Sequence, residues 1–288
     1  MSAIESLLQR LEQLLVRIEA RLPPLPTAVD WSATAYCWRR EAFYGYLQAV
    51  TASAIPRLDD LLCIDDAKQR VVANTRQFLA GAPANHALIW GPRGTGKSSI
   101  IKALLTEFAD QGLRLIEVDR DHLADLPDII ERLANRPEWF ILFCDDLSFE
   151  AQDTRYKALK VILDGSVRAG AANVLVYATS NRRHLLPESQ RDNWEAQMID
   201  GDLHHGESVE ERISLSERFG LWLPLHPFSQ EEYLRIVHHW LQRLGAPGAG
   251  ETVEQAALQW ALRQGSRSGR SAWQFARDWA GRAAVPSP

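Results

Sequence analysis

Residues 91 to 98 read GPRGTGKS, and this stretch fits the full phosphate-loop pattern G-x-x-x-x-G-K-[ST]. The apolar run Ala87–Trp90 precedes the motif, and an amphipathic segment over residues 100–105 follows it. A strand, a glycine-rich loop and a helix in this order distinguish a phosphate loop from a chance glycine-rich turn. The motif therefore predicts a strand–loop–helix unit that binds a polyphosphate.

The residue types of the loop suit this task. Three glycines let the backbone adopt conformations that other residues avoid, so its N–H groups can turn inward. A helix that starts near Lys97 directs about half a positive charge at the same point. The Lys97 ammonium adds charge for the β- and γ-phosphates, and the Ser98 hydroxyl is placed to ligate Mg²⁺. The predicted phosphate-binding residues are Gly91, Pro92, Arg93, Gly94, Thr95, Gly96, Lys97, Ser98 and Ser99.

Composition excludes several classes of protein. A net charge of −5 over 288 residues argues against a protein that coats nucleic acid nonspecifically. No run reaches 18 apolar residues, and charged residues at the N-terminus argue against a signal peptide, so we expect neither a membrane span nor secretion. Cys37, Cys63 and Cys144 have no metal or redox spacing, which favours a reduced, cytoplasmic protein.

The N-terminal segment over residues 1–56 is predicted to be a helical extension. Its first part carries an apolar stripe at helical spacing, and the segment Pro-Pro-Leu-Pro at 23–26 ends that helix. The stripe consists of Ile4, Leu7, Leu8, Leu11, Leu14, Leu15, Ile18 and Leu22. It fits packing onto the rest of the chain, which we favour, or self-association as a short coiled coil. An aromatic-rich segment over residues 31–46 follows.

Strand and helix patterns alternate over a central segment, 57–227, which predicts a five-stranded parallel α/β sheet flanked by helices. The expected strands are 88–90, 113–118, 139–144, 174–178 and 221–225. The expected helices are 98–110, 125–135, 154–164 and 185–198. Residues 192–211 read as an acidic loop, in which His204 and His205 lack a third metal ligand at suitable spacing.

The last segment, 228–288, is predicted to be a small helical domain. Ser229 is suited to cap a helix over 230–244, and helices over 252–263 and 271–282 follow. Tryptophans 240, 260, 273 and 279 are the expected core of this bundle.

A second motif lies about 50 residues after the phosphate loop, where the apolar strand Trp139–Cys144 ends in two acids. This pattern is typical of a Walker B element, in which Asp145 holds Mg²⁺ and Asp146 orients the attacking water. The second acid is usually glutamate, so Glu150 is an alternative base. An ordinary acidic turn after a strand would give the same local sequence.

With these motifs in place, the chain resembles the AAA+ ATPases over about residues 57 to 284. Asn181, in VLVYATSN, is similar to sensor 1, and Arg218, in SERFG, is similar to the arginine finger. Arg270 resembles sensor 2 at the start of the last lid helix, with Arg267 as the alternative. These resemblances imply roles for Asn181, Arg218 and Arg270 in catalysis.

The segment LLCID over residues 61–65 resembles the part of AAA+ proteins that packs on adenine, which implies base contacts for Leu62 and Ile64. Both could equally be ordinary core residues. A closer resemblance is to a bacterial AAA+ family designated domain of unknown function 815, carried by WGPRGTGKSSIIKALL, FCDDLSFE and SLSERFGLWLP. The Asp145–Asp146 pair is also similar to Walker B of DnaA-type initiators, an analogy that does not fix function.

The resemblance implies an ATP–Mg²⁺-dependent ATP hydrolase that remodels a protein partner and forms rings or arcs of identical subunits. Two alternatives remain, a slow ATP-gated switch or scaffold and a loader or initiator that acts on nucleic acid; the acidic balance disfavours the latter. Polypeptide-threading relatives carry an aromatic–aliphatic–glycine loop after the second strand, whereas this chain has DRDHL at 119–123. Threading through a central pore is therefore disfavoured.

Overall fold

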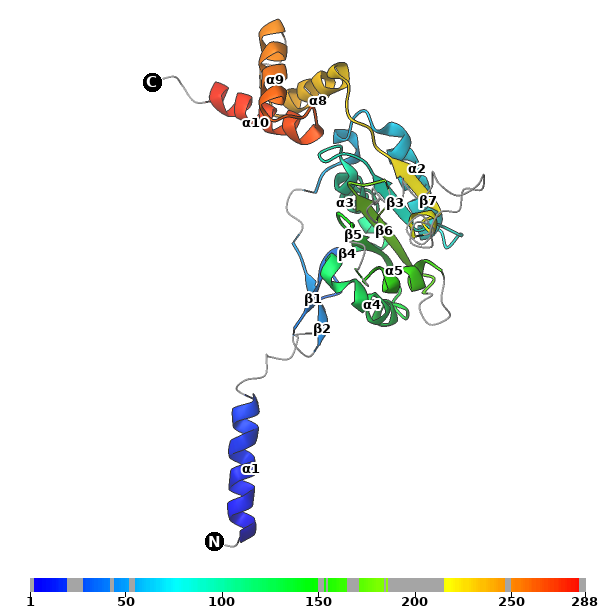
Figure 1. Cartoon of the computed structure of the whole chain (residues 1–288), viewed down its shortest axis with the longest axis vertical. Coiled ribbons are helices and arrows are strands. Elements are labelled where there is room, and N and C mark those ends of the chain that lie inside the picture. The colour runs from blue at the N-terminus through cyan, green and yellow to red at the C-terminus, as the bar shows by residue number, and fades with distance from the viewer. Residues whose placement is uncertain are drawn as a thin grey trace, which may run out of the picture.

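The computed structural model describes residues 3–19, 28–41, 44–51, 55–149, 153, 155–164, 171–183, 185, 215–246 and 250–284. Figure 1 shows an α/β body, a group of helices at its upper end and a single N-terminal helix that projects from its lower end.

One sheet of seven strands forms the body, in the order β2-β1-β4-β5-β6-β3-β7. The strands are β1 (Ala35–Arg40), β2 (Gly45–Ala49), β3 (Ala87–Trp90), β4 (Leu113–Glu117), β5 (Trp139–Cys144), β6 (Val174–Ser180) and β7 (Leu221–Pro224). All neighbouring strands are parallel except β1 and β2, which form an antiparallel pair. The five expected strands are present, but the expected total of five is wrong.

The two additional strands also correct the expectation of a wholly helical N-terminal extension. Strand β1 pairs in parallel with β4, so the hairpin extends the sheet at that edge. Tyr36 and Trp38 alternate with less buried neighbours, which is the period of a strand rather than a helix. The Trp38 indole donates a hydrogen bond to the buried Asp125 carboxylate at 2.9 Å, and the Arg40 guanidinium pairs with the same group. These contacts fix the hairpin against the body.

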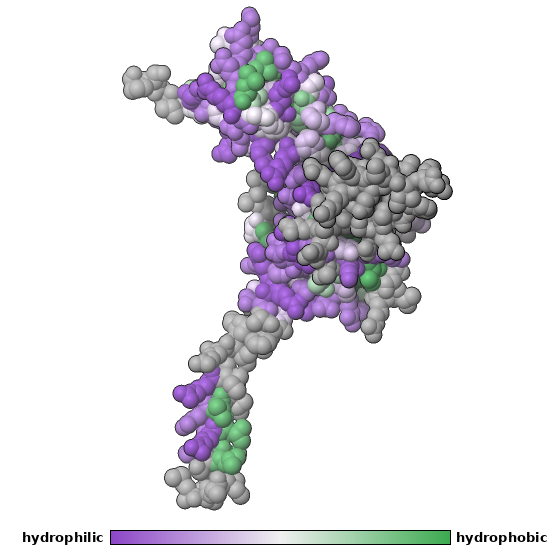
Figure 2. Space-filling view, in the orientation of Figure 1, coloured by the Kyte–Doolittle hydropathy of each residue, from purple (hydrophilic) through white to green (hydrophobic). Residues whose placement is uncertain are grey.

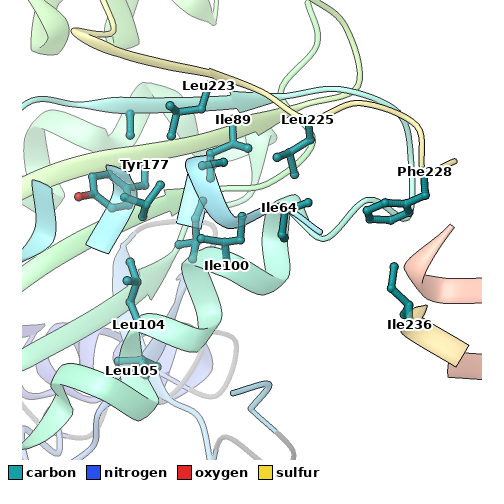
Figure 3. Close-up of a cluster of buried hydrophobic side chains, with 14 of the residues drawn as sticks. Ile64, Ile89, Ile100, Leu104, Leu105, Tyr177, Leu223, Leu225, Phe228 and Ile236 are labelled. Carbon is teal, nitrogen blue, oxygen red and sulfur yellow. The ribbon is translucent and has the colours of Figure 1, made fainter. Parts of the chain in front are cut away.

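Helices cover both faces of the sheet. The helices of the described residues are α1 (Ala3–Glu19), α2 (Asp65–Leu79), α3 (Lys97–Phe108), α4 (Leu126–Leu133), α5 (Tyr156–Leu163), α8 (Gln230–Arg243), α9 (Glu251–Arg263) and α10 (Gly269–Ala284), with 3-10 turns η1 (Leu58–Asp60), η2 (Ala109–Gln111) and η3 (Arg120–Asp125). A separate hydrophobic cluster lies on each face of the sheet. Ile141 belongs to the first cluster, whereas its neighbours Phe140 and Leu142 belong to the second. Figure 3 shows the first cluster, in which Ile89 and Leu223 of the sheet lie over Ile100 of α3.

The C-terminal helices α8–α10 occupy the positions expected from the sequence. Ser229 caps α8 in a complete capping box with Glu232. Trp240, Trp260 and Trp279, which we expected in the core of this bundle, are partly buried and pack against the first hydrophobic cluster. The rings of Trp240 and Trp273 lie 4.5 Å apart.

Helix α1 differs from the expectation that its apolar stripe packs onto the rest of the chain. Leu7, Leu8, Leu11 and Leu14 are between 48% and 62% exposed. Figure 2 shows them as an apolar band along the projecting helix. No helix among the described residues is long and apolar enough to cross a membrane. The expected acidic loop over 192–211, with His204 and His205, lies outside the described residues, as does the expected helix after residue 185.

Candidate nucleotide-binding and catalytic site

The phosphate loop connects β3 to α3, as its sequence predicts. Gly91, Gly94 and Gly96 all have positive φ angles, of 144°, 78° and 103°. A Cβ atom at Gly91 would lie 2.1 Å from the Leu225 carbonyl oxygen, and one at Gly94 would lie 2.8 Å from the Ser268 side chain. Only glycine therefore fits where the loop passes β7 and the C-terminal helices.

Lys97 is the first residue of α3, and its side chain is buried within the loop. Its ammonium donates hydrogen bonds to the carbonyl oxygens of Gly91 and Pro92, both at 2.8 Å, and to Asn181 Oδ1 at 2.9 Å. Burial lowers the pKa of Lys97, although the nearby carboxylates of Asp146 and Asp145 oppose the shift. The ammonium is thus held at the mouth of the loop, beside the expected sensor residue.

Asp145 is the centre of a small hydrogen-bond network at the end of β5. Its Oδ1 atom accepts from Ser98 Oγ at 2.6 Å and from Thr179 Oγ1 at 2.5 Å. The phosphate-loop serine and the Walker B aspartate therefore meet, although 47 positions separate them in the chain. Thr179 lies on β6, next to β5, so the parallel order of the strands brings the three oxygens together.

Asp146 has a different environment from its neighbour. It is exposed, and its backbone has a φ of +50°, which is uncommon for a residue with a side chain. Its N–H donates to Thr179 Oγ1 at 2.9 Å, and its carboxylate accepts a hydrogen bond from the Asn181 amide. The local conformation therefore turns the second acid away from the sheet and toward Asn181.

These groups line one cavity of about 810 Å³ between the sheet and the C-terminal helices. The predicted site residues on its wall are Leu62, Ile64, Arg93, Gly94, Thr95, Gly96, Lys97, Ser98, Ser99, Asp145, Asp146, Asn181 and Arg270. Ile64 is also part of the large hydrophobic cluster, so the base-contact and core alternatives both describe it. Trp240 and Trp273 also line the cavity and add to the apolar part of its wall.

The C-terminal helices touch the phosphate loop directly. The Gly269 N–H, at the start of α10, donates a hydrogen bond to the Gly94 carbonyl oxygen at 2.8 Å. Arg270 is the next residue and lines the cavity, whereas Arg267 does not. A second connection joins η1 to α8, because the buried Asp60 carboxylate accepts hydrogen bonds from His239 at 3.0 Å and from Arg243 Nη2 at 3.2 Å.

Some predicted residues lie elsewhere. Gly91 and Pro92 contribute carbonyl groups to Lys97 but are not on the cavity wall, and Arg218 is not on it either. Arg218 lies just before β7 and pairs with Asp164. Glu150, the alternative base, lies outside the described residues.

Sequence reasoning missed Thr179, Trp240 and Trp273 as parts of the site. Thr179 lies two positions before Asn181, near the end of β6, and this position in the sequence could have identified it as a site residue. The two tryptophans carried no motif, since their helical spacing fits an ordinary core. Among the described residues, no group of three or more His, Cys, Asp or Glu side chains is placed to hold a metal.

A protein-family model matches most of this chain. The model is described as protein of unknown function (DUF815), and it matches residues 31–283. The replication factor C large subunit of Ignicoccus hospitalis is 34% identical over 80 residues, which are 27% of this chain and only 16% of that protein. The chain thus matches a small part of that relative's length.

The fold is similar to that of a solved structure. A RuvB mutant from Thermotoga maritima superposes with a TM-score of 0.51 at 14% identity, covering 80% of this chain and 67% of that chain. The replication initiator DnaA bound to AMPPCP and single-stranded DNA matches with a TM-score of 0.48 at 16% identity, over 77% of this chain and 63% of that one. Because the family model matches residues 31–283, which are most of the chain, the chain belongs to the DUF815 family, and its fold is similar to that of RuvB.

Proposed function

We propose that this protein binds ATP with Mg²⁺ and hydrolyses it to ADP and phosphate, and that it uses this cycle to remodel a protein partner. The observation that carries the proposal is the convergence of Ser98, Asp145 and Thr179 beside Lys97. Chain segments far apart in sequence meet there, in a cavity that both the sheet and the C-terminal helices line. A chance glycine-rich turn would not gather these partners.

The residues present fit a magnesium ion and a polyphosphate. Ser98 and Asp145 offer a hydroxyl and a carboxylate, the hard oxygen ligands that Mg²⁺ prefers. The positive φ angles of the loop glycines allow the loop to take its turn, and the N-terminus of α3 lies at its end. When bound, the ion would neutralise charge on the phosphate oxygens.

The chain's own groups supply the remaining functions. Lys97 exchanges its contacts with loop carbonyls for contacts with phosphate oxygens. Asp146 accepts a proton from the attacking water, and Asn181 orients that water or the γ-phosphate. Leu62 and Trp273 bury apolar surface against the adenine, at about 25 cal/mol per Å².

A second candidate use is a slow ATP-gated switch, which the second Walker B acid favours. Asp146 has one methylene less than the usual glutamate, and the Asn181 amide already engages its carboxylate. Such a site would hold ATP for longer and report it through the C-terminal helices, because Gly269 contacts the phosphate loop. The turnover rate separates the switch from the remodelling ATPase.

A third use, on nucleic acid, rests on the names of the compared proteins, which are a replication factor, RuvB and a DnaA–DNA complex. Salt-dependent binding of DNA by the full chain would support this use, since neutralised phosphates release counterions. A binding constant that does not change with salt would count against it.

The proposal is tested first by calorimetry on Lys97→Ala. We expect tight ATP binding to be lost, because the substitution removes the charge at the loop's mouth. The control is Lys102→Ala, which removes a lysine farther along α3 that pairs with Glu117 instead, and which should bind ATP normally. Unchanged ATP affinity in Lys97→Ala would overturn the nucleotide site itself. A pull-down with ATP-loaded Asp146→Asn would then identify the partner.

A further inference from the structure

Helix α1 presents a continuous apolar surface. Leu7, Leu8, Leu11 and Leu14 are 62%, 60%, 48% and 55% exposed. In Figure 2 they form one band along the projecting helix, bordered by polar residues. Single exposed leucines are common on protein surfaces, but four on one side of a helix mark an interaction surface.

The sequence of this helix repeats every seven residues. Residues 4–10 read IESLLQR and residues 11–17 read LEQLLVR, with an apolar residue first and identical glutamate, leucine, leucine and arginine positions after it. A seven-residue repeat keeps the apolar stripe facing one partner along a supercoiled helix pair or bundle. The repeat therefore points to helix–helix association rather than to a membrane or a flat surface.

Charges at the edges of the stripe indicate the partner and its direction. At 100° per residue, Arg10 and Arg17 lie along one edge of the leucine stripe, and Glu12 lies along the other. All three are exposed. When two identical helices pack in parallel, the basic edge of one meets the acidic edge of the other. When they pack antiparallel, like edges meet and repel.

We propose that α1 packs in parallel against α1 of other copies of this chain, with the four leucines at the interface. The stripe spans three columns of the heptad, which is wider than the two-column seam of a two-stranded coiled coil. It therefore fits a bundle of more than two helices. This surface is separate from the ATP site, since α1 ends before the residues that the family model matches.

Two considerations set the strength of this contact. A 17-residue helix is marginal in water by itself, so α1 gains most of its stability from the bundle. Copies already held together elsewhere would raise the local concentration of α1 to the millimolar range. An anionic membrane is a poorer partner, because residues 3–19 contain two arginines against three glutamates.

The test uses the full chain without nucleotide and measures its mass by analytical ultracentrifugation over a range of concentrations. The wild type should form oligomers, and Leu8→Asp/Leu11→Asp should raise the apparent dissociation constant about a hundredfold or more. The matched control is Gln9→Asp/Gln13→Asp, which adds the same charge on the opposite side of α1 and should leave the mass unchanged. A monomeric wild type, or equal masses for all three proteins, would overturn the proposal.

Direction is tested separately. Arg10→Glu/Arg17→Glu should weaken a parallel bundle at least tenfold, whereas an antiparallel pair already places like charges together and would not respond. Leu8→Cys should form a disulfide between copies under mild oxidation. In an antiparallel pair centred on Leu11 the two cysteines would lie about 9 Å apart along the axis, out of reach of a disulfide. An unaltered mass together with absent cross-linking would reject the parallel arrangement.

Two further measurements keep this result independent of the ATP site. Lys97→Ala should still assemble through α1, and Leu8→Asp/Leu11→Asp should still bind ATP in the calorimeter. Co-sedimentation with phosphatidylserine vesicles that requires Leu8 and Leu11, from a protein that is monomeric in solution, would assign α1 to a membrane surface and overturn the proposal.

Discussion

At the residue scale, Asp145 and Asp146 are neighbours in sequence with separate environments. Asp145 is tied to Ser98 and Thr179 by two hydrogen bonds, which suits a group that holds a metal ion. Asp146 is exposed, adopts a positive φ and reaches Asn181. A non-glycine residue in that conformation costs on the order of 1–3 kcal/mol, and such strain concentrates at functional sites.

The two acids should therefore differ when each is changed to asparagine. Asp145→Asn should reduce the Mg²⁺ dependence of ATP binding, because it removes the carboxylate that meets Ser98. Asp146→Asn should bind ATP normally and lose about 10²–10⁴ in turnover, the usual contribution of a positioned base. Calorimetry with and without Mg²⁺, together with phosphate release, measures both effects.

Asp128→Asn is the control for both variants, since Asp128 is exposed on α4 and away from the cavity wall. Wild-type turnover in Asp146→Asn would show that Glu150 or another group is the base.

His86 makes stability depend on pH. Its Nδ1 atom accepts a hydrogen bond from the Val176 N–H at 3.0 Å, which requires the neutral ring. Burial lowers the pKa of His86 to about 4, from the usual value of 6.5 for histidine. The unfolded chain therefore binds more protons than the folded one between these values, so stability falls as pH drops from 6.5 to 4.

The loss across this range should be on the order of 2–3 kcal/mol from His86 alone. His86→Gln cannot take up a proton there, so its free energy of unfolding should change less between pH 6.5 and pH 4.5. Urea unfolding of both proteins at the two pH values makes the comparison. Equal pH dependence would assign the acid sensitivity to other groups.

At the scale of elements, α10 connects the phosphate loop to the other C-terminal helices. Gly269 contacts the phosphate loop and Arg270 follows on the cavity wall, so a bond from Arg270 to the γ-phosphate would draw α8–α10 toward the sheet. Arg270→Ala should then bind ATP and ADP with more nearly equal affinity, because only ATP carries that phosphate. Competition binding of the two nucleotides measures the ratio.

Arg267→Ala is the matched control, since Arg267 precedes the same helix but is not on the cavity wall. It should keep the wild-type preference for ATP. If Arg267→Ala loses the preference and Arg270→Ala keeps it, the sensor role belongs to Arg267.

The elements also show what the sequence could predict. Strand β5 begins and ends where its apolar run does, and Ser229 caps α8 as expected, because both signals are local. The hairpin β1–β2 was missed, although its strands are longer than β3 and β7. It is held by partners distant in sequence, such as Asp125 for Trp38.

The same distinction applies to the site. Motif residues such as Lys97 and Asp145 were predictable, because the chemistry of phosphate binding fixes their spacing. Trp240 and Trp273 could be assigned to the cavity only from the folded structure, since tertiary proximity alone brings them there.

At the scale of the whole molecule, a single chain does not bring Arg218 to its own cavity wall. Arg218 lies before β7 and pairs with Asp164. If it acts as an arginine finger, it must serve the cavity of a neighbouring subunit. The ATP site of a lone chain would then be incomplete, and hydrolysis would require a ring or arc of subunits.

Specific ATPase activity should therefore rise with protein concentration, and Arg218→Ala should bind ATP yet hydrolyse it about 10³–10⁵ times more slowly, the range measured for arginine fingers. Mixing Arg218→Ala with Lys97→Ala should restore part of the activity. In mixed assemblies the Lys97→Ala subunit donates an intact finger to the intact phosphate loop of its neighbour, and neither protein can make that pair alone. Asp164→Ala removes the carboxylate that pairs with Arg218 but keeps Arg218 itself. This variant should therefore hydrolyse ATP without the addition of a second protein. Activity that is independent of concentration, with no recovery on mixing, would place the complete catalytic site within one chain and favour the monomeric switch.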